Sequence, residues 1–252
     1  MIGIFDSGIG GLSVFREIRK LLPQESYIYY SDNAHCPYGE KSIEYIIERA
    51  RSITGFLLEK GADIIVVACN TATAAAIKTL REEFPHTPFI GMEPAIKPAV
   101  KKTASGTIGV LATAGTLKAA KYLDTRERWA ENVRIHEHVG QGFVELVESG
   151  RLDGPEAEDI VRSSLKPLLD SGADVIVLGC THYPFLSGVI AKVAKGLYPD
   201  RAISIIDPAP AVARHLLEVM TEKGLLADNG YSICLFSSGE GTKLKERYNT
   251  LL

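Results

Sequence analysis

The chain has 252 residues, a formal net charge of −3 and no basic run longer than Lys101-Lys102. Its hydrophobic fraction of 46% and charged fraction of 23% are typical of a globular protein. The lack of a basic stretch argues against nucleic acid or an anionic membrane surface as a partner, and favours a small molecule or a protein. A chain of this length is sufficient for two modest domains, each with its own core.

The N-terminus is a short apolar strand from Ile2 to Phe5, without the basic and apolar regions of a secretory signal. We therefore expect a cytoplasmic protein, without an N-terminal extension that could carry a regulatory site. No apolar run approaches the roughly 18 residues of a membrane span. The chain has four cysteines without CxxC spacing, a pattern that in a reducing compartment favours free thiols over disulfides or zinc: Cys36, Cys69, Cys180 and Cys234.

A glycine-rich turn from Asp6 to Leu12 follows the first strand and opens a helix that we expect to reach about Leu22. Glycines allow backbone N–H groups to approach an anion at a helix N-terminus. The simpler interpretation is a tight turn in which Asp6 or Ser7 caps the helix. Dinucleotide binding is disfavoured, because the G-x-G-x-x-G spacing is not met.

The first half then alternates strands and helices. The predicted elements are a strand from Tyr27 to Ser31, a polar loop from Asp32 to Glu40, a helix from Ser42 to Lys60, a strand before Cys69, a helix from Thr71 to Phe84 and a strand from Phe89 to Gly91. The loop is long enough to form a lid or the wall of a pocket. Apolar residues at helical spacing in the Ser42 helix, beginning with Ile43, predict its core face.

The second half repeats this order after a short helix from Pro94 to Lys102, where we place a domain crossing. The predicted elements are a strand through Gly109, a helix from Thr116 to Trp129, a strand from Ile135 to His138, a helix from Pro155 to Asp170, a strand before Cys180 and a strand from Ile203 to Ile206, and the segment from Phe143 to Ser149 precedes the second helix. A helix from Ala211 to Lys223, a strand from Tyr231 to Phe236 and a terminal helix then return to the first domain. The predicted domains are residues 1–94 with 208–252, and residues 95–207.

An internal repeat relates the two halves. When Cys69 is placed over Cys180, the segment from Ala62 to Ala74 aligns with the segment from Ala173 to Phe185. Each copy is a β-branched apolar run, which indicates a strand buried in a parallel sheet, with the cysteine at its carboxyl end, where ligands bind in open α/β sheets. We expect an α/β protein of two pseudo-symmetric doubly wound domains, with the active site and both cysteines in the cleft between them.

Two opposed thiols are suited to inverting a stereocentre, because one base removes a proton from one face of a carbon while an acid returns one to the other. A thiol has a pKa of roughly 8.5, so thiol and thiolate coexist near neutrality. The helix N-terminus expected after each cysteine favours the thiolate. Cys36 and Cys234 lack this symmetry, and we expect them to be small core residues.

Four motifs carry a family resemblance: Asp6 to Gly11, Pro37 to Gly39, Ala68 to Ala72 and Gly179 to Pro184. Together they resemble the glutamate racemases of the cofactor-independent aspartate/glutamate racemase superfamily, and the similarity spans most of the chain. The resemblance implies interconversion of L- and D-glutamate for peptidoglycan in a cytoplasmic homodimer, without pyridoxal phosphate or metal.

The same resemblance implies residue roles. Cys69 and Cys180 would exchange the proton, with Asp6 beside the first cysteine, His182 beside the second, and Glu148 as an acidic residue of the second half. The substrate-binding residues would be Asp6, Ser7, Pro37, Tyr38, Gly39, Asn70, Thr71, Thr113, Thr181 and His182. The segment Gly140-Gln141-Gly142 departs from the family pattern, which usually has Cys-Pro before the acidic residue.

Other interpretations remain open at this point. A related racemase or decarboxylase could act on another acid, although a decarboxylase needs only one cysteine. Cys69, Cys180 and His182 could bind a metal, but zinc normally takes four ligands and no fourth is spaced nearby. A non-catalytic amino-acid sensor would not need two opposed thiols. His182 could also be only a helix cap, as could Asp6.

Overall fold

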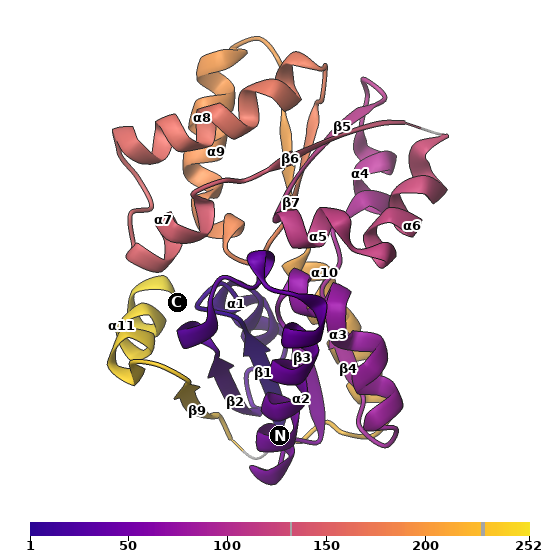
Figure 1. Ribbon diagram of the computed structural model, residues 1–252, viewed down its shortest axis with the longest axis vertical. Coiled ribbons are helices and arrows are strands. Elements are labelled where there is room, and N and C mark those ends of the chain that lie inside the picture. Colours follow the sequence, from indigo (N-terminus) through magenta and orange to yellow (C-terminus); the bar gives the residue numbers. More distant parts are fainter. Residues whose placement is uncertain (132, 228–229) are drawn as a thin grey trace. The chain divides into compact units, whose positions relative to one another are not determined.

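The computed structural model describes residues 1–131, 133–227 and 230–252 (Figure 1). The chain forms two compact units: unit 1 consists of Met1–Met92 and Ala209–Leu252, and unit 2 of Glu93–Pro208. The crossings fall one or two residues from the positions predicted at 94/95 and 207/208. Each unit contains its own parallel sheet with helices, which confirms the predicted α/β class.

Unit 1 is built on a five-stranded sheet in the order β4-β3-β1-β2-β9, and every neighbouring pair is parallel. The strands are β1 (Ile2–Asp6), β2 (Ser26–Ser31), β3 (Ile64–Val67), β4 (Phe89–Gly91) and β9 (Ser232–Ser237). All residues of β1 and β3 are buried, as their unbroken apolar sequences predict for central parallel strands.

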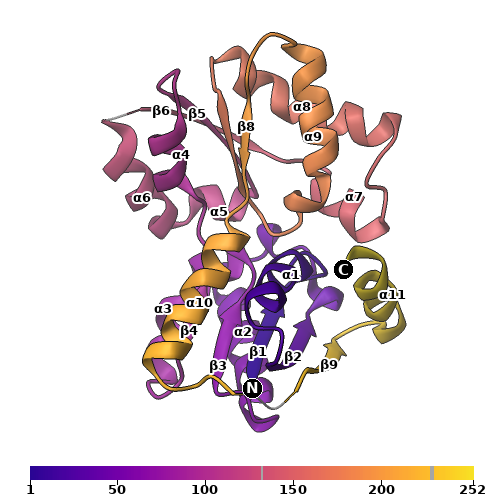
Figure 2. The same cartoon turned by 180° about the vertical axis from the view of Figure 1, so that it is seen from behind.

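The helices of unit 1 cover both faces of this sheet, with α2 packed on α3 and α1 packed on α10 (Figures 1 and 2). They are α1 (Leu12–Leu21), α2 (Ile43–Glu59), α3 (Asn70–Glu83), α10 (Ala209–Glu222) and α11 (Gly241–Leu251), with short 3₁₀ turns η1 (Asn33–His35) and η2 (Tyr38–Glu40). The buried face of α2 includes Ile46 and Ile53, as predicted. Ile43, predicted to lie on the same face, is 58% exposed. It is the first residue of α2 and lies at the end of the helix outside the core.

Unit 2 has a four-stranded parallel sheet in the order β6-β5-β7-β8. The strands are β5 (Thr107–Ala112), β6 (Arg134–Val139), β7 (Val175–Gly179) and β8 (Ser204–Ile206). The helices are α4 (Ile96–Lys102), α5 (Ala114–Lys118), α6 (Ala120–Ala130), α7 (Phe143–Ser149), α8 (Pro155–Asp170) and α9 (Ser187–Leu197), with the 3₁₀ turn η3 (Tyr183–Leu186).

The single helix predicted from Thr116 to Trp129 was wrong, because Ala119 is extended and separates α5 from α6. The break accompanies the burial of Tyr122, which donates a hydrogen bond of 2.8 Å to Glu137 on the neighbouring strand. Tertiary packing therefore outweighs the local helix propensity of this segment.

The repeat seen in the sequence is a repeat of sheet topology. In unit 1 the order β4-β3-β1-β2 matches β8-β7-β5-β6 in unit 2, strand for strand along the chain. Strand β9 is an addition to unit 1 alone, where it extends the sheet beyond β2, so the tail returns to the first unit as predicted.

This strand order places both cysteines at equivalent positions. The chain leaves β1 toward β2 on one side and later returns to β3 on the other side, so the order of the strands reverses between β1 and β3. The same reversal lies between β5 and β7. In open α/β sheets ligands bind outside the carboxyl ends of the strands at such a reversal. Cys69 follows β3 and Cys180 follows β7, each at the reversal of its own unit.

Candidate active-site residues in each unit

Cys69 is the N-cap residue of α3 and is only 5% exposed. Its Sγ accepts a hydrogen bond from the amide of Ala72 at 3.4 Å and lies 3.7 Å from Ser7 Oγ. The first N–H groups of a helix carry partial positive charge and have no acceptor within the helix, so they favour a thiolate at the cap. The predicted environment of Cys69, a helix N-terminus with a nearby donor, is therefore present.

The turn after β1 holds Asp6 and Ser7 beside the start of α1. Asp6 is fully buried, and its Oδ2 accepts a hydrogen bond from the amide of Gly8 at 2.9 Å. The prediction that Asp6 or Ser7 caps α1 was wrong, because the N-cap is Gly11 and it makes no side-chain cap bond. The Asp6 carboxylate closes its own turn instead. A Cβ at Gly11 would lie 2.7 Å from the Asp6 Cβ, so only glycine fits there.

Asn70 and Thr71 begin α3 directly after Cys69, and both are buried. Among the residues that the structure describes, neither Oδ1 nor Nδ2 of Asn70 has a hydrogen-bond partner. Leaving a buried polar group without a partner costs about 1 to 3 kcal/mol. The amide at the carboxyl end of β3 is therefore suited to receive a polar ligand.

The loop after η1 contains Pro37, Tyr38 and Gly39. The Tyr38 side chain is buried, and its hydroxyl donates to Oδ2 of Asp32 at 2.5 Å. Burial and the adjacent Asp32 charge raise the pKa of the Tyr38 phenol. Because Pro37 and Gly39 are half-buried while the phenol is bound to Asp32, the main chain is the part of this loop suited to contact a ligand.

Sequence reasoning missed Asp32 itself. This carboxylate is 0% exposed and accepts two hydrogen bonds from Arg49 on α2, at 2.9 Å from Nε and 2.8 Å from Nη2. Burial disfavours its charged form, but hydrogen bonds from Arg49, Tyr38 and Ser238 outweigh burial and lower the pKa of Asp32. A signal was present in the sequence, because Arg49 lies on the same helical face as Ile46 and Ile53.

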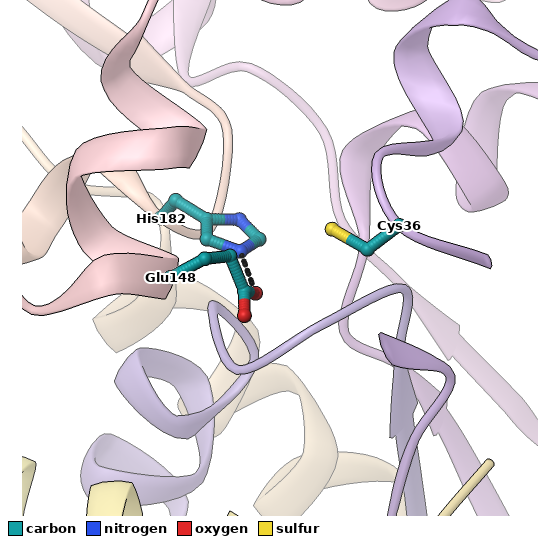
Figure 3. Close-up of side chains that lie close together, drawn as sticks. All are labelled: Cys36, Glu148 and His182. Atoms are coloured by element: carbon teal, nitrogen blue, oxygen red, sulfur yellow. Dashed lines mark hydrogen bonds and ion pairs between the residues drawn. The ribbon is translucent and has the colours of Figure 1, made fainter. Parts of the chain in front are cut away.

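Cys180 has a different neighbour. It is 6% exposed, and its Sγ lies 3.8 Å from Nδ1 of His182. The other ring nitrogen, Nε2, is hydrogen-bonded to Glu148 Oε1 on α7 at 2.8 Å, as Figure 3 shows. A carboxylate at Nε2 keeps a proton on that nitrogen, which leaves Nδ1 to exchange a proton with the thiol. His182 is thus held between thiol and carboxylate, and it makes no side-chain cap bond to the following 3₁₀ turn.

The α-helix expected directly after Cys180 is absent. The chain instead forms η3, and α9 begins only at Ser187. The physical reason is Pro184, which lacks the N–H that would donate the first α-helical bond to the Cys180 carbonyl, so Tyr183 donates to that carbonyl in a 3₁₀ bond of 3.1 Å. Thr181, also predicted to bind substrate, is buried beside the thiol.

The unusual segment before Glu148 is explained by packing. A Cβ at Gly140 would lie 2.5 Å from the Tyr183 hydroxyl oxygen, and Gly142 has φ 81° as the N-cap of α7. Both glycines therefore allow α7 to approach η3, where Phe143 and Tyr183 stack edge to face at 4.8 Å. The departure from the family pattern leaves Glu148 in contact with His182.

The remaining predicted residues are placed as follows. Thr113 is the N-cap of α5, and its Oγ1 accepts from the amide of Thr116 at 3.3 Å. All four cysteines are free thiols. The expectation that Cys36 and Cys234 are core residues was wrong: Cys36 is half-buried in the loop before Pro37, and Cys234 is exposed on the edge strand β9.

Comparison with known proteins agrees with these features. A family model described as Asp/Glu/Hydantoin racemase matches residues 2–216. The glutamate racemase of Stutzerimonas stutzeri (strain A1501) is 48% identical over 243 residues, which cover 96% of this chain and 90% of that protein. Within the described residues, no helix is both long and apolar enough to span a membrane.

Solved structures that are similar to this chain are also glutamate racemases. A glutamate racemase isoform from Bacillus anthracis matches with a TM-score of 0.87 and 34% identity, covering 98% of this chain and 91% of that chain. The Escherichia coli glutamate racemase, solved with L-glutamate and the activator UDP-MurNAc-ala, matches with a TM-score of 0.85 and 36% identity over 98% of this chain and 94% of that one. The chain therefore belongs to the Asp/Glu/hydantoin racemase family, and within it to the glutamate racemases, which are amino-acid isomerases.

Proposed function

We propose that this racemase interconverts L- and D-glutamate by a two-base mechanism that uses Cys69 and Cys180. One cysteine, as thiolate, removes the proton from Cα, and the other, as thiol, delivers a proton to the opposite face. The observation that carries the proposal is the position of the two buried cysteines, each directly after the strand at the order reversal of its own sheet. The substrate would be held with one cysteine on each side of Cα.

The direction of the reaction sets the role of each thiol. We assign removal of the proton from L-glutamate to Cys180 and from D-glutamate to Cys69. His182, supported by Glu148, accepts or returns the Cys180 proton, since its Nδ1 lies 3.8 Å from that sulfur. On the other side, Asp6 and Ser7 tune Cys69, together with the amides that begin α3.

Substrate contacts follow from the same arrangement. The α-amino and α-carboxylate groups would be bound by the polar residues next to the two cysteines: Asn70, Thr71, Thr113 and Thr181, with Asp6, Ser7 and His182. The main chain of Pro37, Tyr38 and Gly39 would bind the side-chain carboxylate. Because two thiols suffice for the proton exchange, the proposal requires neither pyridoxal phosphate nor a metal. The product would supply D-glutamate for peptidoglycan in the cytoplasm, and the enzyme would act as a homodimer.

Racemisation in D₂O tests the two-base mechanism. Each thiol serves one face, so product formed from L-glutamate should carry deuterium at Cα while unreacted substrate stays protiated in the early phase. Mass spectrometry of the separated enantiomers measures both. Product that retains the original proton would contradict the proposal, because a single base moving between faces returns the proton it removed.

Substrate choice tests the assignment of the loop. Aspartate is shorter by one methylene and cannot reach both sets of donors, so unpaired donors should cost about 1 to 3 kcal/mol each. We expect kcat/KM for aspartate to be at least about 100-fold below that for glutamate, as measured by enantiomer-resolved chromatography. Comparable values for the two acids would refute this assignment of the loop.

A further inference from the structure

We infer that Asp32, held by Arg49, is a positioning residue that fixes the Tyr38 loop, defined here as residues 36–41, and so sets the affinity for substrate. The inference rests on the proposed function, which assigns the main chain of this loop to the side-chain carboxylate. Asp32 itself would not touch the substrate.

Each oxygen of the Asp32 carboxylate has a structural partner. Oδ1 accepts from Arg49 Nη2, and Oδ2 accepts from Arg49 Nε and from the Tyr38 hydroxyl. A fully buried carboxylate needs such compensation. Because the planar guanidinium binds through two parallel bonds, it fixes the orientation of the carboxylate as well as its charge. The orientation of the carboxylate then fixes the Tyr38 hydroxyl.

Asp32 lies at the carboxyl end of β2, next to the turn that follows β1. The backbone amide of Asp32 donates a hydrogen bond of 2.9 Å to the carbonyl of Asp6 at the end of β1. Asp6 begins the turn that carries Ser7, which lies beside Cys69. Asp32 therefore connects the end of β1, the helix α2 and the Tyr38 loop. A shift of this carboxylate would move the loop relative to Cys69 within the same unit.

Residues 33–35, which lead into the loop, are held by contacts of their own. At its start, the Asn33 Oδ1 accepts from Ser237 Oγ at 2.8 Å, and the Ala34 amide donates to Ser238 Oγ at 3.1 Å. His35 Nδ1 lies 2.5 Å from the Tyr45 hydroxyl oxygen on α2. These contacts hold residues 33–35. The Asp32–Tyr38 bond reaches into the substrate-binding part of the loop.

The molecule contains a matched control on the same helix. Arg51 makes a two-bond contact with Glu83 on α3, at 2.6 Å from both Nε and Nη2. This pair has the geometry of Arg49 with Asp32, but its side chains are 47% and 34% exposed and it lies away from the loop. Replacement of either arginine by lysine keeps the charge and removes the two-bond geometry. A difference between the two variants therefore reports on the position of the pair.

The first experiment compares Arg49→Lys with Arg51→Lys in the full-length enzyme. For Arg49→Lys we expect KM for glutamate to rise by about tenfold or more while kcat changes less than about threefold, and for Arg51→Lys both should stay within about twofold. Tyr38→Phe should resemble Arg49→Lys. Because both substitutions act through Asp32, KM of the double variant should exceed KM of the more severe single variant by no more than about twofold.

A second experiment makes the inference independent of activity. Hydrogen exchange of the amides in residues 36–41 should be faster in Arg49→Lys and Tyr38→Phe than in the parent protein, and unchanged in Arg51→Lys. If Arg49→Lys does not fold, Tyr38→Phe decides. A lower Tm for Arg49→Lys with unchanged KM and unchanged exchange would overturn the inference and leave Asp32 a structural role only. If the parent protein does not racemise glutamate, the proposed function fails, while faster loop exchange still supports the positioning role.

Discussion

The two cysteines occupy equivalent places in related sheets but have different surroundings. Cys69 caps the 14-residue helix α3 and accepts a hydrogen bond from the backbone amide of Ala72 in its first turn. Cys180 precedes a 3₁₀ turn, and its neighbour is His182, backed by Glu148. The first thiol thus lies at the backbone dipoles of a helix, beside Ser7, and the second beside a hydrogen-bonded pair of side chains.

This difference shows that a duplicated fold can keep the place of a reactive group while changing how the group is tuned. Backbone N–H groups stabilise a thiolate without changing their own protonation. An imidazole can take and return a proton, which makes its support dependent on pH. Two bases of similar strength can therefore be obtained by different physical means.

Removal of either thiol should have the largest effect. Cys69→Ala and Cys180→Ala each remove a base in one direction and an acid in the other, so racemisation should fall by about 10³-fold or more in both directions. A coupled assay and polarimetry measure the two directions. Cys234→Ala, at an exposed thiol on β9, is the matched control and should keep activity within about twofold. Near-normal racemisation by a folded Cys69→Ala or Cys180→Ala protein would refute the mechanism.

Replacement of His182 should separate the two halves of the reaction. His182→Asn should lower kcat by about 100-fold, and Glu148→Gln, acting through His182, by about tenfold. The kcat values for the two directions should change unequally. The ratio of kcat/KM values must stay at unity, because enantiomers have equal free energy. Primary isotope effects at Cα should likewise become unequal. Equal changes in both directions would assign His182 to substrate binding or to the fold.

Low pH should destabilise unit 1, which contains Cys69, by protonating Asp32. The pKa of this carboxyl is lowered in the folded protein from its ordinary value of 3.8, so its ionised form stabilises the fold above that pH and loses this contribution as pH falls through the folded pKa. Asp32→Asn should therefore lower stability by about 3 kcal/mol near neutrality. The deficit in the free energy of unfolding should be full above pH 3.8 and should shrink only below it, as pH falls through the lowered pKa of Asp32 in the folded protein. Glu83→Gln, at an exposed ion pair, should change the free energy of unfolding only slightly at any pH. A loss of stability for Asp32→Asn that does not vary with pH would contradict the role of the ionised Asp32 carboxylate.

The smallest expected effects distinguish Ser7 from Thr113, which follow the equivalent strands β1 and β5. Ser7→Ala removes a hydroxyl 3.7 Å from Cys69 Sγ and should lower kcat by a few-fold, with little change in Tm. Thr113→Ala removes the cap of α5 and should cost about 1 kcal/mol of stability. Thermal unfolding and initial rates measure both. A large loss of stability for Ser7→Ala would place that hydroxyl in the fold.

The sequence predicts strands β3 and β7 and the position of a cysteine after each of them, because both are encoded by residues that are close together in the chain. A β-branched run such as Ile64 to Val67 is buried wherever it occurs in a parallel sheet, and the repeat locates the thiol after each run. Pro155 to Asp170 matched its predicted bounds, since proline begins the helix and Gly172 follows its end.

Other features depend on contacts between distant residues. The pairing of Asp32 with Arg49 needs the fold of β2 against α2, and a polar loop before Pro37 indicates only a turn. The break at Ala119 depends on where Tyr122 finds its partner. The turn after Cys180 was predictable in principle, because Pro184 stands four residues after the cysteine and lacks the N–H for the first α-helical bond. Asp6 was misassigned because a cap and a closed turn use the same residue types.

Strand β9 has a consequence for the order in which the protein is made. Ser26 of β2 meets Ser232 of β9 across 206 residues, and the whole of unit 2 is translated between them. A nascent chain can therefore complete the second sheet while the outer edge of β2 is still unpaired. During that interval the partners of Asn33 and Ala34 at residues 237–238 do not yet exist. The segment that leads into the Tyr38 loop thus acquires these anchors late, so ribosome-bound chains and truncated products that stop short of this strand should not racemise glutamate.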